Sequence, residues 1–281
     1  MAGKDSEKHT ANASEEKDEM SLWGHLNALR GHLFRSTLAI VLFFIVAFVN
    51  REFIFDRIIL APLNDDFISN RALCRLGELL HMPSICLGSI KLNLININLS
   101  GQFLMHMYIS FFTALTVASP YIIWEIWRFI RPALYENERK HSRGAVLVMS
   151  VLFILGLLFS FFLIVPLTLN FFGNYQVSDA VTNQIALNSY ISTVISVTFS
   201  MGIIFELPVF VFFLAKVGIL TPEFLRRSRR YMIVILLTVA AIITPPDVVS
   251  QILVVIPLWG LYELSIVVAA RAIRKAQKIT D

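Results

Sequence analysis

The stretch AVLVMSVLFILGLLFSFFLIVPLTL, residues 145–169, carries no charged side chain. A helix needs roughly 20 mostly apolar residues to cross the hydrocarbon core of a bilayer. This stretch exceeds that length, and the basic segment RFIRPALYENERKHSRG (128–144) precedes it directly. Residues 145–169 therefore predict a membrane-spanning helix.

The composition of the whole chain supports a membrane protein. Of its 281 residues, 56% are hydrophobic and only 16% are charged. A soluble domain is about a quarter charged. The excess of apolar residues is gathered in long runs, which indicates that lipid is the main solvent of this chain.

Five further runs resemble spans in length and polarity. They are residues 33–49, 103–124, 190–215, 231–243 and 248–270. The sequence thus predicts an all-α membrane protein with six transmembrane helices, of which the last two are short. A tight turn is expected between those two, because the prolines of TPPD (244–247) lack a backbone donor and fix φ.

The expected domain organisation is simple. The first 20 residues are polar and mixed in charge, which predicts a disordered cytoplasmic tail. No apolar segment follows a basic start there, so these residues do not resemble a secretory signal peptide. One six-helix membrane domain is expected over 21–275, followed by a short cytoplasmic tail over 276–281.

The distribution of Lys and Arg predicts the orientation. The terminal segments and the loops around 128–143 and 216–230 hold 19 of these residues, and the other side of the predicted membrane holds 5. Because cytoplasmic loops carry the excess of positive charge, both termini are expected in the cytoplasm.

The longest segment on the opposite side covers about 50–102. IKLNLININL (90–99) alternates apolar and polar residues, which is typical of a strand or extended edge. Cys74 and Cys86 both lie in this segment. On an oxidising side of the membrane they could form a disulfide or remain as two thiols.

Motifs of common enzymes are missing from the sequence. It contains no GxxxxGK[ST], HExxH, GxSxG or CxxC pattern, and its six histidines are scattered. His106, within a predicted span, is more typical of a helix-packing or interfacial residue than of a ligand. We expect neither an enzyme nor a cofactor, a metal site or nucleic-acid binding.

Two carboxylates fall inside predicted spans. Glu206, in FELPV, is costly at membrane depth unless it is paired, hydrated or protonated. It either faces a polar pocket of the fold or works in a wet cavity. Glu263 lies nearer a helix end, where it could reach the interface. Thr244 and Gln251 offer a polar face either to a partner helix or to packing within the chain.

The loop 128–144 contains acids that topology does not require. Its arginines and lysine hold it in the cytoplasm, whereas Glu136 and Glu138 add nothing to that function. They could form local salt bridges worth roughly 0–1 kcal/mol. Alternatively, with the aromatic rings of Trp127, Phe129 and Tyr135, they could bind a cationic peptide, since carboxylates recognise Arg by bidentate hydrogen bonds.

Several stretches together resemble the TatC family of the twin-arginine protein translocase. The matching stretches are HLNALRGHLFR (25–35), APL (61–63), SPYIIWEIWRFIRPALYENERK (119–140), FELPV (205–209), GILTPEFLRRSRRY (218–231) and LLTVAAIITPPDVVSQ (236–251). The combination of PALYxxER, FExPV and TPPDxxSQ is specific, and the resemblance extends from about residue 21 to 270.

The resemblance implies a cup-shaped receptor in the bacterial inner membrane. Such a protein binds the twin-arginine signal peptides of folded precursors at the cytoplasmic face. It assembles with single-span partners of the TatA and TatB type and self-associates in a larger complex within the lipid. Transport is driven by the proton-motive force.

The resemblance also implies roles for individual residues. Glu138 matches the loop acid that pairs with a signal-peptide arginine. Phe129, Pro132, Tyr135, Arg139, Leu26 and Arg30 match its surroundings. Glu206 matches a buried glutamate of the fourth helix, and Asp247 and Gln251 match the outer turn and partner-contact region. Many relatives carry an acid where this chain has Ala28, so Glu136 or Glu125 could substitute for it.

Two other classes of function share some of these features. A proton-coupled small-solute transporter would use Glu206 as its proton carrier but leaves the acidic and aromatic loop without a role. A structural scaffold would require no function of Glu206.

Overall fold

The computed structural model describes residues 22–64, 66–79, 93–130, 142–178, 183–244 and 248–280. Most of these residues are helical. The helices are α2 (Leu22–Val49), η1 (Phe53–Ile59, a π-helix), η2 (Ala61–Leu63, a 3-10 helix), α3 (Ile68–Leu79), α4 (Gly101–Ile130), α6 (Ser142–Phe159), η5 (Ser160–Ile164, a π-helix), α7 (Val165–Asn174), α8 (Leu187–Phe205), α9 (Leu207–Lys216), α10 (Pro222–Arg227), α11 (Arg229–Ile243) and α12 (Val248–Thr280).

Five helical stretches in the described part of the chain are long and apolar enough to cross a membrane. They are Leu29–Val49, Gly101–Phe129, Gly144–Asn174, Leu187–Lys216 and Gln251–Arg271. Each coincides with a predicted span. The remaining predicted span, 231–243, lies in α11, whose 15 residues at about 1.5 Å per residue make a helix shorter than a typical hydrocarbon core, as expected for a short span.

The prediction that the last helix is short is wrong. α12 runs for 33 residues and continues to Thr280, through most of the segment predicted as a tail. The apolar run ends near residue 270, but the ARAIRKAQKIT that follows is rich in strong helix formers. Hydropathy therefore predicted the membrane-crossing part and missed the polar extension.

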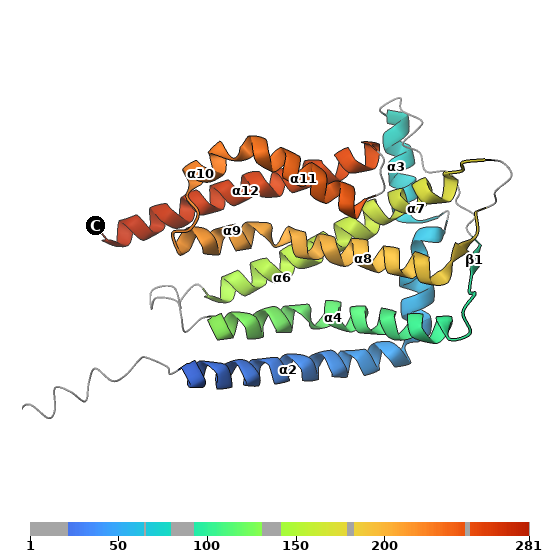
Figure 1. Ribbon diagram of the computed structural model, residues 1–281, viewed down its shortest axis with the longest axis horizontal. Helices are drawn as coiled ribbons and strands as arrows, with labels where there is room; N and C mark the ends of the chain where they lie inside the picture. The colour runs from blue at the N-terminus through green and yellow to red at the C-terminus, as the bar shows by residue number, and fades with distance from the viewer. Residues whose placement is uncertain are drawn as a thin grey trace, which may run out of the picture.

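The long helices lie side by side in chain order across the molecule (Figure 1). α2 packs on α4, α4 on α6, and α6 on α8, while α12 contacts both α9 and α11. The start of α2, the end of α4, α10 and the carboxyl end of α12 lie at one end, which we call the basic end. Cations at this end whose side chains the structure describes include Arg30, Arg35, Arg128, Lys216, Arg226, Arg227, Arg229, Arg230 and Arg271.

The opposite end holds α3, α7 and a small parallel strand pair. Strands β1 (Leu94–Ile95) and β2 (Ile185–Ala186) pair in the register Leu94 to Ile185 and Ile95 to Ala186. The extended structure expected within 90–99 is confirmed at β1. Cys74, on α3, is disulfide-bonded in the structure, and Cys86 lies outside the described residues.

Proline positions coincide with irregularities in two of the spans. The third span passes from α6 through the π-helix η5 into α7, which has Pro166 in its first turn. The fourth span divides at Glu206, with Pro208 near the start of α9. Proline lacks the backbone donor and clashes with the preceding turn, so a helix ends or bends there.

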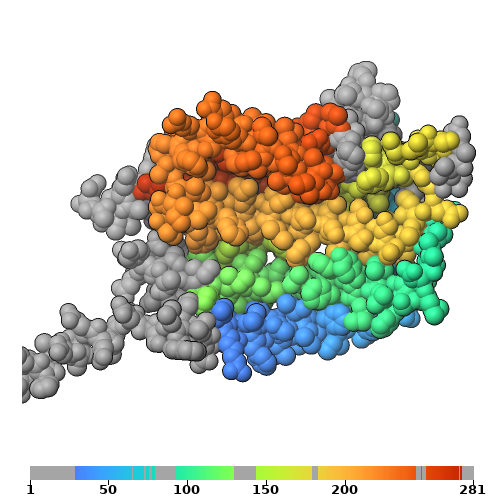
Figure 2. Space-filling model, in the orientation of Figure 1, coloured from blue at the N-terminus to red at the C-terminus, as the bar shows by residue number. Residues whose placement is uncertain are grey.

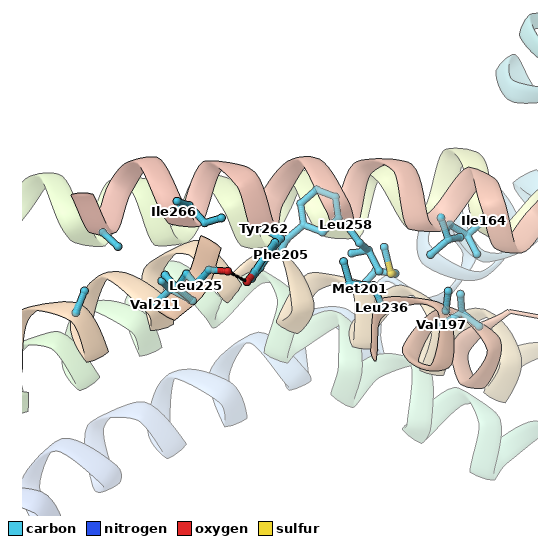
Figure 3. Packing of buried hydrophobic residues seen from close by; sticks show 14 residues of the cluster. Ile164, Val197, Met201, Phe205, Val211, Leu225, Leu236, Leu258, Tyr262 and Ile266 are labelled. Atoms are coloured by element: carbon cyan, nitrogen blue, oxygen red, sulfur yellow. Dashed lines mark hydrogen bonds between the residues drawn. The ribbon is translucent and has the colours of Figure 1, made fainter. Parts of the chain in front are cut away.

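The largest core cluster joins α8, α9, α11 and α12 (Figure 3). Met201, Leu236 and Leu258 are buried at its centre. Tyr262 is 1% exposed, and its hydroxyl donates to the carbonyl of Leu225 at 2.7 Å. This bond ties α10 to α12 where the apolar core meets the basic end.

Tyr262→Phe tests this tie. The ring keeps its packing, while the Leu225 carbonyl loses the hydroxyl and keeps the Ser228 amide at 3.2 Å, so we expect a loss of about 0.5–1.5 kcal/mol of stability. Thermal unfolding of the purified protein in detergent measures it. Tyr231→Phe is the matched control, because that side chain is exposed. Equal melting temperatures for the two variants would contradict a structural role of this hydrogen bond.

Candidate functional site

A buried carboxylate joins α2 and α4 near the basic end. Glu125, on α4, is 1% exposed, and its Oε2 contacts Nδ1 of His32 on α2. Its Oε1 accepts from the Tyr121 hydroxyl at 3.0 Å and lies 3.4 Å from Nε of Arg35. The carboxylate is thus surrounded by one partner from its own helix and two from α2.

The charges in this cluster fit one assignment of protons. An ionised carboxylate only accepts hydrogen bonds, so Nδ1 of His32 must carry the proton that points to Glu125. The same nitrogen, 3.3 Å from Nη2 of Arg35, then cannot accept from that guanidinium. Arg35 therefore interacts with the Glu125 carboxylate as an ion pair. Its side chain is 44% exposed, so other N–H groups of the guanidinium can donate to solvent.

An aromatic and cationic surface lies beside this cluster. The His32 ring meets Phe129 edge-on, with 6.0 Å between the ring centroids. Arg128 lies over the Trp124 ring at 5.6 Å, and Arg30 is exposed on α2. The start of α2 and the end of α4, which carry the described members of the predicted peptide patch, are thus neighbours.

Glu206 occupies the junction between α8 and α9. Its backbone carbonyl accepts from the amides of Val209 and Phe210, which begins α9. The residue is half-buried, and Oε1 is buried without a hydrogen-bond partner among the residues that the structure describes. The expectation of a functional wet cavity at Glu206 stays a prediction.

The other intramembrane polar residues make contacts within the chain. Glu263 accepts from Nη2 of Arg229 at 2.6 Å, which pairs α12 with α11. The Thr244 hydroxyl donates to the Ala240 carbonyl at 2.8 Å, and Gln251 Nε2 donates to the Leu237 carbonyl at 3.0 Å. Gln251 thus makes a contact between α12 and α11, whereas Thr244 bonds to the preceding turn of its own helix, and contact of either residue with a partner helix stays a prediction.

Most of the predicted peptide patch lies outside the described residues. The patch residues that lie outside the described residues are Pro132, Tyr135, Glu136, Glu138 and Arg139. Asp247 of the predicted outer turn also lies outside them. Of the described members, Leu26 and Arg30 lie on α2, and Phe129 lies near the end of α4.

His32, Arg35 and Tyr121 were not singled out from the sequence. Their spacings contain a signal: residues 32 and 35 are three apart on one helix, and 121 and 125 are four apart on another, so each pair shares a face. The sequence leaves Glu125 as one possible substitute for the acid that is missing at Ala28. In the structure its oxygens are already engaged by residues of this chain.

His106 also joins α2 to α4, at the opposite end of the same interface. Its Nε2 lies 3.1 Å from the carbonyl oxygen of Phe48, and the two rings stack with 4.1 Å between centroids. The expectation that His106 serves helix packing is confirmed.

Comparison with known proteins identifies the family. The family model described as Sec-independent protein translocase protein (TatC) matches residues 24–257. The TatC protein of Blattabacterium sp. subsp. Periplaneta americana (strain BPLAN) is 38% identical over 256 residues, which covers 90% of this chain and 96% of that protein. TatCy of Bacillus subtilis (strain 168) is 33% identical over 261 residues, 93% of each chain.

The fold agrees with the sequence comparison. A crystal structure of the twin arginine translocase receptor TatC superposes with a TM-score of 0.65 at 32% identity, covering 88% of this chain and 99% of that one. A second crystal structure of that receptor, in DDM, superposes with a TM-score of 0.67 at 32% identity. The match covers 87% of this chain and 99% of that one. With its five apolar helical stretches, the chain is a multi-pass membrane protein and a member of the TatC family of Sec-independent protein translocases.

Proposed function

We propose that this protein is the receptor subunit that binds twin-arginine signal peptides of folded precursors at the cytoplasmic face. One observation carries the proposal: the family match covers the start of α2 and the end of α4, and these two helix ends lie side by side at the basic end. Phe129 and Arg30 belong to this region. In the sequence, Glu138 lies between the end of α4 and the start of α6.

The proposed topology places the basic end in the cytoplasm. The Lys and Arg residues gathered there support this orientation under the positive-inside rule. Six helices would then form a cup in the inner membrane, with α11 as the short fifth crossing and both termini inside. Partners of the TatA and TatB type would complete the translocase, and the proton-motive force would drive export.

Glu138 is the proposed acceptor for a signal-peptide arginine. A carboxylate matches the planar guanidinium by two parallel hydrogen bonds, whereas the ammonium of Lys offers only a point charge. Pro132, Tyr135 and Arg139 would shape the surroundings. With Ala28 in place of an acid and Glu125 engaged internally, Glu136 is the proposed second acid.

A peptide that differs only in its arginine pair tests the receptor function. A fluorescent signal peptide should bind the purified protein in nanodiscs, and the same peptide with Lys-Lys should bind at least about tenfold more weakly, a difference of 1.4 kcal/mol. Equal affinities would show that binding does not depend on guanidinium recognition and would contradict the proposal.

Oε1 of Glu206, which has no hydrogen-bond partner in the described part of the chain, favours one alternative, proton-coupled transport of a small solute. The purified protein alone in vesicles would then dissipate an imposed pH gradient, and Glu206→Gln would stop this flux. A receptor that works only with partner subunits should show no such flux. A dye that reports the internal pH distinguishes the two functions.

A further inference from the structure

Among the residues that the structure describes, α4 is the main neighbour of α2. α2 lies at one edge of the bundle and packs along α4 (Figures 1 and 2). Its other faces are open, as exposed side chains show along most of its length. These include Leu33, Phe34, Leu38, Leu42, Ile45 and Val49. The α4 interface therefore decides where the start of α2 lies.

Two polar contacts fix this interface near its ends. At the opposite end, His106 binds the Phe48 carbonyl. At the basic end, Glu125 receives His32 and Arg35. Loss of the Glu125 contact would cost more free energy than loss of the His106 contact, because a buried carboxylate is strongly unfavourable unless it is paired and hydrogen-bonded.

Movement of α2 away from α4 would leave the Glu125 carboxylate without most of its partners. If the start of α2 swung away from α4, Glu125 would lose His32 and Arg35 and keep only the Tyr121 hydroxyl. Removing the partners of a buried charge costs much more than an exposed ion pair contributes. The carboxylate therefore favours the arrangement in which α2 is closed onto α4.

We propose that Glu125 is a positioning residue for the peptide patch. By binding His32 and Arg35, it holds the start of α2, with Leu26 and Arg30, at the spacing from Phe129 that a signal peptide requires. This inference rests on the proposed receptor function. Burial of Glu125 and the full engagement of its oxygens argue that it acts through α2 and does not touch the peptide itself.

Spin labels measure the positioning without any activity. One pair, at the exposed positions Leu33 and Ile126, reports on the basic end, and a second pair, at Val49 and Phe103, reports on the opposite end. Glu125→Gln keeps the side-chain volume but removes the charge, so the first distance should lengthen or broaden while the second stays unchanged. An unchanged distance distribution at the first pair would overturn the proposal.

Peptide binding adds a readout that general destabilisation would not reproduce. Glu125→Gln should lower the affinity for the twin-arginine peptide about tenfold. Glu125→Asp, which keeps the charge, should have an affinity within about threefold of the parent. His106→Ala is the matched control, because it breaks the other α2–α4 contact. It should shift the second label pair and leave peptide affinity within about twofold.

Arg35→Gln separates positioning from direct peptide binding. Arg35 is half exposed, so the variant should fold, and it should weaken peptide binding by about threefold. Tighter binding would mean that Arg35 competes with the peptide for Glu125, which would overturn the positioning role. If the parent shows no preference for the twin-arginine peptide, the receptor function fails, and the spin-label distances still decide whether Glu125 positions α2.

Discussion

Replacing Glu138 by Arg should raise the Kd for a twin-arginine peptide by at least about 100-fold. Truncating one partner of a hydrogen-bonded charge pair costs about 2–5 kcal/mol or more, and a like charge in its place adds repulsion. Each 1.4 kcal/mol is a factor of ten in affinity, so binding should fall below detection in a nanodisc assay.

Matched charge reversals show whether this loss is specific. Glu223→Arg changes an exposed acid on α10, also at the basic end, and should leave peptide affinity unchanged. Glu136→Arg should weaken binding by about tenfold if this residue is the second acid. Normal binding by the Glu138→Arg variant would remove the assigned role, provided that all three variants insert and melt like the parent.

Gly156→Leu should prevent stable packing of α6 against α8. A Cβ atom at Gly156 would lie 2.7 Å from the Met201 carbonyl oxygen, 2.9 Å from Gly202 Cα and 2.9 Å from Phe205 Cβ. Two of these atoms belong to the backbone and cannot rotate away. Overpacking a core costs about 1–3 kcal/mol and sometimes more, and Leu adds three carbons beyond the Cβ.

Gly260→Leu provides the matched control for this prediction. Gly260 is also a glycine within a span, and an added Cβ would meet no heavy atom within 4 Å. It should fold normally, whereas the Gly156 variant should aggregate or melt far below the parent in detergent. Similar melting temperatures for both variants would show that α6 and α8 do not approach as closely as the structure indicates.

The membrane spans could be predicted from sequence because lipid imposes one simple requirement. Every backbone polar group must be satisfied within the helix, and side chains facing lipid must be apolar. Hydropathy therefore located the five long spans and the short run that forms most of α11. It failed for the polar extension of α12, because helix propensity alone continues that helix beyond the lipid.

The candidate site was only partly predictable for a different reason. Phe129 and Arg30 follow from motifs that are contiguous in sequence, so the resemblance located them. The cluster around Glu125 depends on His32, a residue 93 positions away, and no local pattern predicts which faces of two helices meet. The sequence showed an acid near the end of a span, and only the packing of α2 on α4 shows that its oxygens are engaged.

Photo-crosslinking from position 138 tests the receptor function most directly. A photoreactive residue there, in membranes that also contain the partner subunits, should form an adduct with the signal peptide of a folded precursor. The adduct should disappear when the two arginines of that peptide are replaced by lysines. An adduct that persists with the lysine pair, or that forms elsewhere on the protein but never at 138, would contradict the proposal that this loop binds the twin-arginine motif.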